Sequence, residues 1–190
     1  MGAPLVWING FPGVGKLTIA TALQAIDEHI ILIDNHKMID PVEAKFSRDH
    51  PDYQRERRAQ REAVFARHVT ADDAKDHTIV FTDCQSDNDL GRAVATEYKL
   101  AAETAGRDFI PVYLSCDKHE NLKRVSSAER VGSKTTKLTS KAILKDILSN
   151  NELFRFEGCS SLTLDITQLS PAEAALQIRS HIQKCAGETA

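Results

Sequence analysis

The residues of this sequence that most plainly suggest chemistry form a glycine-rich loop followed by a lysine. Gly10, Gly13 and Gly15 lie close together, and Lys16 follows the last of them. Glycines let backbone N–H groups wrap around a phosphate at close range, in dihedral angles that a Cβ atom would hinder. The lysine ammonium and the start of the following helix add positive charge at the same place. This spacing predicts a site for the phosphates of a nucleotide.

The loop departs from the usual phosphate-binding pattern, G-x-x-x-x-G-K-[ST], at one position. Gly10, Gly15 and Lys16 match the pattern, whereas Leu17 occupies the hydroxyl position and Thr18 comes one residue late. A chance glycine turn is the alternative, but an apolar run precedes the loop and a helical pattern follows it, as the motif requires. The residues that we expect to bind nucleotide are Gly10, Gly13, Val14, Gly15, Lys16, Leu17 and Thr18.

Two carboxylates follow apolar runs elsewhere in the chain. Asp34 comes directly after the run 30–33, and Asp83 follows the run 78–81 with Thr82 between. A carboxylate at such a place can orient a hydroxyl group that attacks a phosphoryl group, or can hold a water of a Mg²⁺ shell. Each has a structural alternative, since Asp34 could cap the next helix and Asp83 could form a turn. We expect Asp34 to act on the acceptor, and Asp83 together with Thr18 to serve Mg²⁺.

The elements that must position these residues alternate along the chain. Short, β-branched apolar runs suit strands of a parallel sheet that is buried on both faces, and the stretches between them have helical spacing. An α/β doubly wound sheet places ligands at the carboxyl ends of its strands. The expected strands are 5–8, 30–33, 78–81, 109–114 and 162–166, and the expected helices are 16–26, 53–69, 90–105, 119–126, 140–150 and 171–184.

Composition limits the classes of function. A net charge of −3 gives no overall field for nucleic acid or an anionic membrane, so we expect neither as a partner. The four cysteines lie far apart and lack zinc spacing, which indicates thiols in a reducing compartment. No repeat or linker divides the chain, which predicts a single domain over residues 1–190 in a cytoplasmic protein, as a monomer or homodimer.

The loop resembles that of the P-loop kinase superfamily, and its late threonine is similar to adenylate kinases. The resemblance implies a three-layer α/β/α fold with five parallel strands in the order 2-3-1-4-5, and Mg-ATP as phosphoryl donor. In architecture the chain also resembles shikimate kinases and chloramphenicol phosphotransferases, in which an aspartate at the end of the second strand contacts the acceptor hydroxyl. That likeness gives Asp34 the acceptor role, and Leu17 indicates that metal is held mainly by phosphates and water.

The same resemblance assigns roles to the inserts. Residues 126–139 would form a lid whose arginines close on ATP, which makes Arg124 and Arg130 candidates for stabilising the transferred charge. Residues 35–70 would bind the acceptor, and one or two arginines of the helix at 53–69 could fix an anionic group. The alternatives are solvated basic loops and a helix with mixed-sign charge pairs. The loop at 167–169 would pack on the base.

These observations predict a kinase that moves the γ-phosphoryl of Mg-ATP to a hydroxyl of a small molecule, with Lys16, Asp34, Arg124 and Arg130 as catalytic residues. A nucleoside or nucleotide monophosphate kinase is one alternative, because such an enzyme would use arginines of the helix at 53–69 and would not need Asp34. A non-enzymatic, ATP-binding regulatory or resistance protein is the other, and Leu17 is the residue that favours it.

Overall fold

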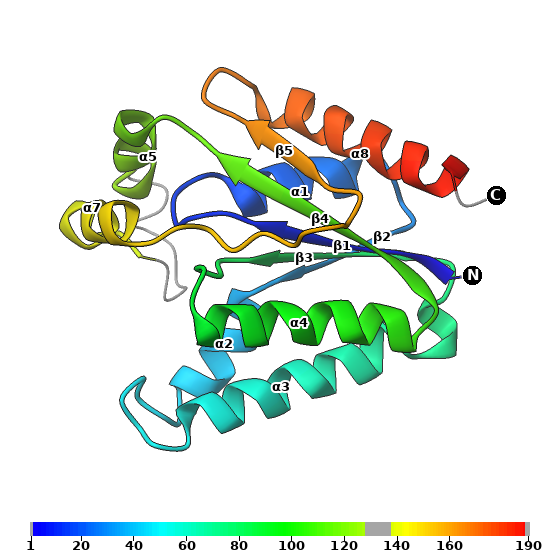
Figure 1. Cartoon of the computed structure of the whole chain (residues 1–190), viewed down its shortest axis with the longest axis horizontal. Helices are drawn as coiled ribbons and strands as arrows, with labels where there is room; N and C mark the ends of the chain where they lie inside the picture. The colour runs from blue at the N-terminus through cyan, green and yellow to red at the C-terminus, as the bar shows by residue number, and fades with distance from the viewer. Residues whose placement is uncertain (1, 128–137, 189–190) are drawn as a thin grey trace.

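The computed structural model describes residues 2–127 and 138–188, with the side chain of the last residue left out. Five strands of this part of the chain form one parallel sheet in the order β2-β3-β1-β4-β5, which confirms the expected fold class and strand order (Figure 1). The strands are β1 (Gly2–Asn9), β2 (Ile30–Asp34), β3 (Thr78–Asp83), β4 (Arg107–Ser115) and β5 (Leu162–Asp165).

Helices cover both faces of this sheet (Figure 1). α1 and α8 lie on one face, and α3 and α4 lie on the other. α5 and α7 lie near the carboxyl ends of the strands. The helices are α1 (Lys16–Ala25), α2 (His36–Glu43), α3 (Tyr53–His68), α4 (Asp89–Thr104), α5 (Lys118–Val125), α7 (Lys141–Asn150) and α8 (Pro171–Glu188).

Alternation along β1 explains the two-sided core. Val6 and Ile8 point into the apolar cluster beneath α1 and α8, whereas Leu5 and Trp7 point into the cluster beneath α3 and α4. All four side chains are fully buried. Because successive strand residues face opposite sides, a central strand covered by two helix layers needs apolar residues at every position.

One element differs from the sequence-based expectation. The expected helices include none between residues 34 and 53, but α2 occupies the first part of that stretch. Met38 and Val42, four residues apart, form its buried face. Pro41 lies inside the helix and obscured this pattern, because a proline in a helix interior removes a backbone donor.

Side chains cap the starts of α4 and α8. Ser170 and Glu173 bond each other reciprocally at the start of α8, and the Asn88 side chain accepts from the N–H of Gly91 at 2.8 Å at the start of α4. None of the described helices is long and apolar enough to cross a membrane.

Candidate active site

The glycine-rich loop connects β1 to α1 and has the backbone that its sequence predicts. Gly13 and Gly15 have φ angles of 85° and 106°, a region that side chains with a Cβ rarely adopt. At Gly10 a Cβ atom would lie 2.9 Å from the carbonyl oxygen of Leu114, so only glycine lets the loop pass this close to β4. The loop therefore presents backbone amides at the N-terminus of α1, as an anion site requires.

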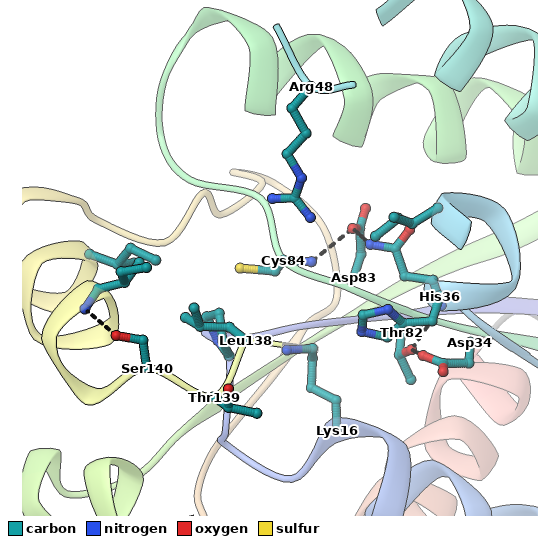
Figure 2. A pocket seen from close by; sticks show the side chains of 15 residues that line it. Lys16, Asp34, His36, Arg48, Thr82, Asp83, Cys84, Leu138, Thr139 and Ser140 are labelled. Carbon is teal, nitrogen blue, oxygen red and sulfur yellow. Dashed lines mark hydrogen bonds between the residues drawn. The ribbon is translucent and has the colours of Figure 1, made fainter. Parts of the chain in front are cut away.

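Lys16 is held against this loop. Its ammonium donates hydrogen bonds to the carbonyls of Gly10 at 2.6 Å and Phe11 at 3.1 Å. Figure 2 shows the same side chain entering a cavity of about 640 Å³, which we call the first cavity. A cation is thus placed where the loop meets the first cavity.

The first cavity has two chemically different walls. The strand ends and the loops beside them give it a polar wall, and α2, α7 and the residues before α7 contribute aliphatic side chains. Its lining residues are Pro12, Lys16, Asp34, Asn35, His36, Ile39, Arg48, Thr82, Asp83, Cys84, Leu138, Thr139, Ser140, Ile143 and Ile147. The structure therefore brings Lys16, Asp34 and Asp83, predicted separately from sequence, to one cavity.

Asp34 is oriented by the neighbouring strand. The parallel register pairs it with Thr82, whose hydroxyl donates to Asp34 Oδ1 at 2.9 Å. The same hydroxyl accepts a long bond of 3.4 Å from the backbone N–H of Asn35. Asp34 does not cap α2 through a side-chain hydrogen bond; Asn35 is the residue before that helix. One oxygen of Asp34 is thus engaged, and the carboxylate lies in the lining of the first cavity.

Asp83 lies in a denser network and is almost completely buried. Its Oδ1 accepts from the Asn35 amide at 2.7 Å, the Cys84 backbone at 2.8 Å and the Gln85 amide at 3.0 Å. Gln85 also donates to Oδ2 at 2.9 Å. Asn9, at the end of β1, bonds the backbone of Gln85 in both directions and so ties the ends of two neighbouring strands together. The network fixes this carboxylate at the edge of the first cavity.

Four of the five arginines of α3 form two pairs, one buried and one exposed, and none of the five lines a cavity of the site. Arg57 is buried and donates to Asn35 Oδ1 at 3.2 Å, and burial lowers its pKa. Arg61, also buried, donates to both oxygens of Glu97. Arg55 and Arg58 form exposed pairs with acidic residues of their own neighbourhood. The alternative of mixed-sign charge pairs therefore describes Arg55 and Arg58. Arg57 and Arg61 instead fix the position of α3.

A second cavity, of about 220 Å³, lies on the other side of the loop. Val14, Gly15, Thr18, Ile19, Arg124, Ile166, Leu169 and Pro171 line it. Arg124 bonds Glu120 at 2.8 Å and makes longer bonds of 3.3–3.5 Å to the carbonyls of Val14, Ile166 and Thr167. Thr18 and Arg124 therefore lie apart from Asp34 and Asp83, which line the first cavity.

Two of the sequence-based expectations lie wholly or partly outside the described residues. Arg130 belongs to the segment 128–137, as does most of the expected lid at 126–139. The flanking residues Leu138 and Thr139 are described, and both line the first cavity.

Sequence reasoning missed several residues of the first cavity. Arg48 and His36 come from the acceptor region at 35–70, but no local motif distinguished them. Asn35, which links Arg57 to Asp83, belongs to no sequence motif. Cys84 lines the cavity, and burial raises its pKa, so the thiol is neutral near pH 7. These residues come together from segments that are distant in the chain, which no local pattern encodes.

The donor set of the site suits a magnesium ion that keeps most of its own water. Among the residues that the structure describes, no group of three or more His, Cys, Asp or Glu side chains converges as a metal site. Asp34 and Asp83 do lie in the lining of the cavity that Lys16 enters. Mg²⁺ bound mainly by phosphates and water needs only one or two such carboxylates.

Comparison with known proteins adds a family match and a set of similar folds. A family model described as an AAA domain matches residues 6–152. A sequence search of curated proteins finds no match. Solved structures that resemble the chain include a gluconokinase from Sinorhizobium meliloti (18% identity, TM-score 0.63, 98% of this chain and 95% of that chain). A shikimate kinase from Acinetobacter baumannii in complex with shikimate is also similar (17% identity, TM-score 0.58, 95% of this chain and 93% of that chain).

A third similar structure holds a nucleotide analogue. It is the Mycobacterium tuberculosis APS kinase CysC in complex with AMPPNP and APS, with 16% identity, a TM-score of 0.59 and coverage of 96% of this chain and 98% of that chain. At these identities the likeness establishes the fold, and it confirms the expected P-loop kinase fold.

Proposed function

Because the chain belongs to the AAA-domain family and has the P-loop kinase fold, we propose that it is a kinase that transfers the γ-phosphoryl group of ATP to a hydroxyl of a small molecule. The observation that carries this proposal is the first cavity, whose lining contains both Lys16 from the phosphate loop and Asp34 from the end of β2. In this cavity, a cation that can bind phosphate and a carboxylate that can accept a hydrogen bond from an alcohol face the same space.

We assign the nucleotide to the loop and to the second cavity. The amides of residues 10–18, the Lys16 ammonium and the Thr18 hydroxyl would bind the phosphates. The second cavity has aliphatic walls from Ile166 and Leu169 and the Arg124 guanidinium, which suit a planar base. This placement gives Arg124 a role toward the base of the nucleotide rather than toward the transferred phosphoryl group, for which it was a candidate from sequence. Arg130 remains a candidate for the transferred charge.

The acceptor hydroxyl is assigned to Asp34. Thr82 engages Oδ1, which leaves Oδ2 to accept a hydrogen bond from the acceptor. The alcohol oxygen forms a bond to the γ-phosphorus while the bond from that phosphorus to the β–γ bridging oxygen breaks, ADP leaves, and the hydroxyl proton passes to Asp34. Asp83, with its fixed carboxylate, would accept from a water of the metal shell. Bound Mg²⁺ would supply charge neutralisation on the phosphates.

The test is an ADP-release assay with Mg-ATP and a panel of hydroxylated small molecules. Asp34→Asn is expected to lower kcat by about 10²–10⁴-fold, the usual contribution of a positioned acid or base, while AMPPNP binding is kept. Asp49→Asn, at an exposed aspartate outside both cavities, is the matched control and should leave kcat unchanged.

Other outcomes of this assay would contradict the proposal. Full activity of Asp34→Asn with a nucleoside monophosphate as acceptor would identify a nucleotide kinase instead. Binding of AMPPNP without transfer to any acceptor would identify an ATP-binding protein that is not an enzyme.

A further inference from the structure

The lining of the first cavity restricts which alcohols it can hold. If the proposed function is correct, the side chains that serve ATP are Lys16 and the loop amides, and Asp34 receives the hydroxyl. Asp83 is occupied by four hydrogen bonds from its neighbours. What remains for the rest of the acceptor is chiefly Arg48, His36, the aliphatic wall and the hydroxyls of Thr139 and Ser140.

Arg48 is a cation held in place at the cavity. Its Nε donates to Glu43 Oε1 at 2.5 Å, and the same oxygen accepts from the Tyr53 hydroxyl at 3.1 Å. Glu43 is mostly buried, with its side chain 15% exposed, and Tyr53 is buried at the start of α3. The Arg48 side chain itself is 66% exposed. Glu43 therefore holds the guanidinium group of Arg48 through its Nε atom.

The terminal nitrogens of Arg48 point toward the centre of the cavity (Figure 2). Lys16 enters from the opposite side in the same view. The fork of an arginine that is held through Nε can still bind a carboxylate or a phosphate with its two terminal N–H groups. His36 lies on the same side as Asp34 and pairs with Asp40 of its own helix at 3.6 Å, so it is a weaker candidate for this role.

The opposite wall is mainly aliphatic, and Thr139 and Ser140 are the residues that bring hydroxyl groups to it. Ile39 comes from α2, Leu138 precedes α7, and Ile143 and Ile147 lie on α7 four residues apart. Ile143 is 53% exposed and, with the other three side chains, presents apolar surface to the cavity. A sugar or another polyol would lose hydrogen bonds to water against the four aliphatic side chains, and the hydroxyls of Thr139 and Ser140 would replace only some of them.

We propose that the acceptor is an anionic alcohol with a hydrocarbon body: a hydroxyl at Asp34, a carboxylate or phosphate at Arg48, and apolar carbon against Ile39, Leu138, Ile143 and Ile147. This inference rests on the proposed function and narrows its acceptor class. It excludes neutral polyols and sugars as good acceptors.

The experiment is isothermal titration calorimetry with Mg-AMPPNP already bound to the protein. The probes form a matched set: 4-(hydroxymethyl)cyclohexanecarboxylate, its carboxamide, gluconate and glucitol, which separate the effect of the anion from that of the hydrocarbon body. The phosphate ester of a hydrocarbon diol distinguishes a phosphate from a carboxylate at Arg48. We expect an anionic hydrocarbon alcohol to bind at least about tenfold tighter than the amide, gluconate or glucitol.

Variants assign that preference to the two walls. Arg48→Gln should abolish the difference between the acid and its amide, and Ile147→Ser should abolish the preference over gluconate. Arg55→Gln is the matched control, because Arg55 is an exposed arginine that pairs with Asp52 outside the cavity; it should change neither. Unchanged binding of Mg-AMPPNP in all variants shows that each protein is folded.

Several results would overturn the inference. They are equal binding of acid and amide, tighter binding of glucitol or gluconate, no binding of any anionic alcohol to the Mg-AMPPNP complex, or a loss in Arg48→Gln that affects AMPPNP instead of the acceptor. Failure of AMPPNP itself to bind would contradict the proposed function, so the two failures are distinguishable.

Discussion

At the scale of single residues, burial keeps a thiol near the site uncharged. Cys116 packs against the apolar cluster beneath α1 and α8, and burial raises its pKa to about 11, although the charge of Arg124 opposes the rise. The thiol therefore stays neutral at neutral pH. The neutral thiol adds no negative charge near Arg124, which lines the second cavity, where we place the nucleotide.

This gives a prediction about thiol reactivity. The rate of Cys116 alkylation by iodoacetamide should rise with an apparent pKa near 11 rather than near the ordinary value of 9, because only the thiolate reacts. The same shift makes stability depend on pH. Between pH 9 and 11 the thiol ionises in the unfolded chain but stays protonated in the folded protein, so raising the pH over this range lowers the free energy of unfolding. Mass spectrometry of the labelled peptide measures the rate, with Cys116→Ser as control. Half-maximal reactivity at pH 9 or below would contradict the assignment.

At the scale of elements, the start of α4 is packed tightly against the end of the β3 segment. Gly91 lies in the first turn of α4, and a Cβ atom there would lie 2.0 Å from the carbonyl oxygen of Ser86. Ser86 follows Gln85, the residue that holds Asp83 from two sides. The close packing of α4 against the backbone of Ser86 thus helps to hold Gln85, and through it Asp83, in place at the first cavity.

Gly91→Ala is therefore expected to lower the free energy of unfolding by about 1–3 kcal/mol, the usual cost of overpacking, since the contact is with backbone that cannot rotate away. Gly187→Ala is the matched control: it also lies in a helix, α8, but an added Cβ would meet no atom within 4 Å. That substitution should be neutral or stabilise by up to about 1 kcal/mol, because alanine favours helix more than glycine does. Urea denaturation of both variants makes the comparison, and equal effects would refute the packing argument.

At the scale of the whole molecule, the phosphate loop lies between two cavities that different parts of the fold build. Strand ends, α2 and α7 line the first, whereas α1, α5, the segment after β5 and the start of α8 line the second. Arg124 of α5 bonds carbonyls of both the loop and the segment after β5. A nucleotide that spans the loop would therefore connect elements from distant parts of the chain, and its binding should stabilise the fold as a unit.

Mg-AMPPNP at about 100 times its Kd should raise the free energy of unfolding by about 2.7 kcal/mol, which corresponds to an increase in Tm of about 5–10 °C for a chain of this size. Lys16→Met should remove most of that increase, because the loop loses its cation. Lys184→Met, at an exposed lysine of α8, serves as the control and should retain it. Differential scanning calorimetry measures the shift; a full Tm increase in Lys16→Met would show that the nucleotide binds elsewhere.

The sequence by itself determined the class of fold, the order of elements and the phosphate loop. These depend on local patterns: continuous apolar runs for buried strands, helical spacing between them, and glycines at the positions with positive φ, Gly13 and Gly15. The boundaries of β1 to β5 contain or nearly contain the expected runs. Parallel strands all end at one edge, so the sequence also predicted that Asp34 and Asp83 would lie near Lys16.

Only the tertiary structure decided which other side chains join them. Arg48 and Arg57 look alike in a sequence rich in arginine, yet Glu43 holds the first at the cavity, and the second is buried against Asn35. The aliphatic wall formed by Ile143 and Ile147 is likewise indistinguishable from a core face until α7 is placed beside the cavity. Contacts between segments that are far apart in the chain depend on how helices pack on the sheet, and no local spacing encodes that packing.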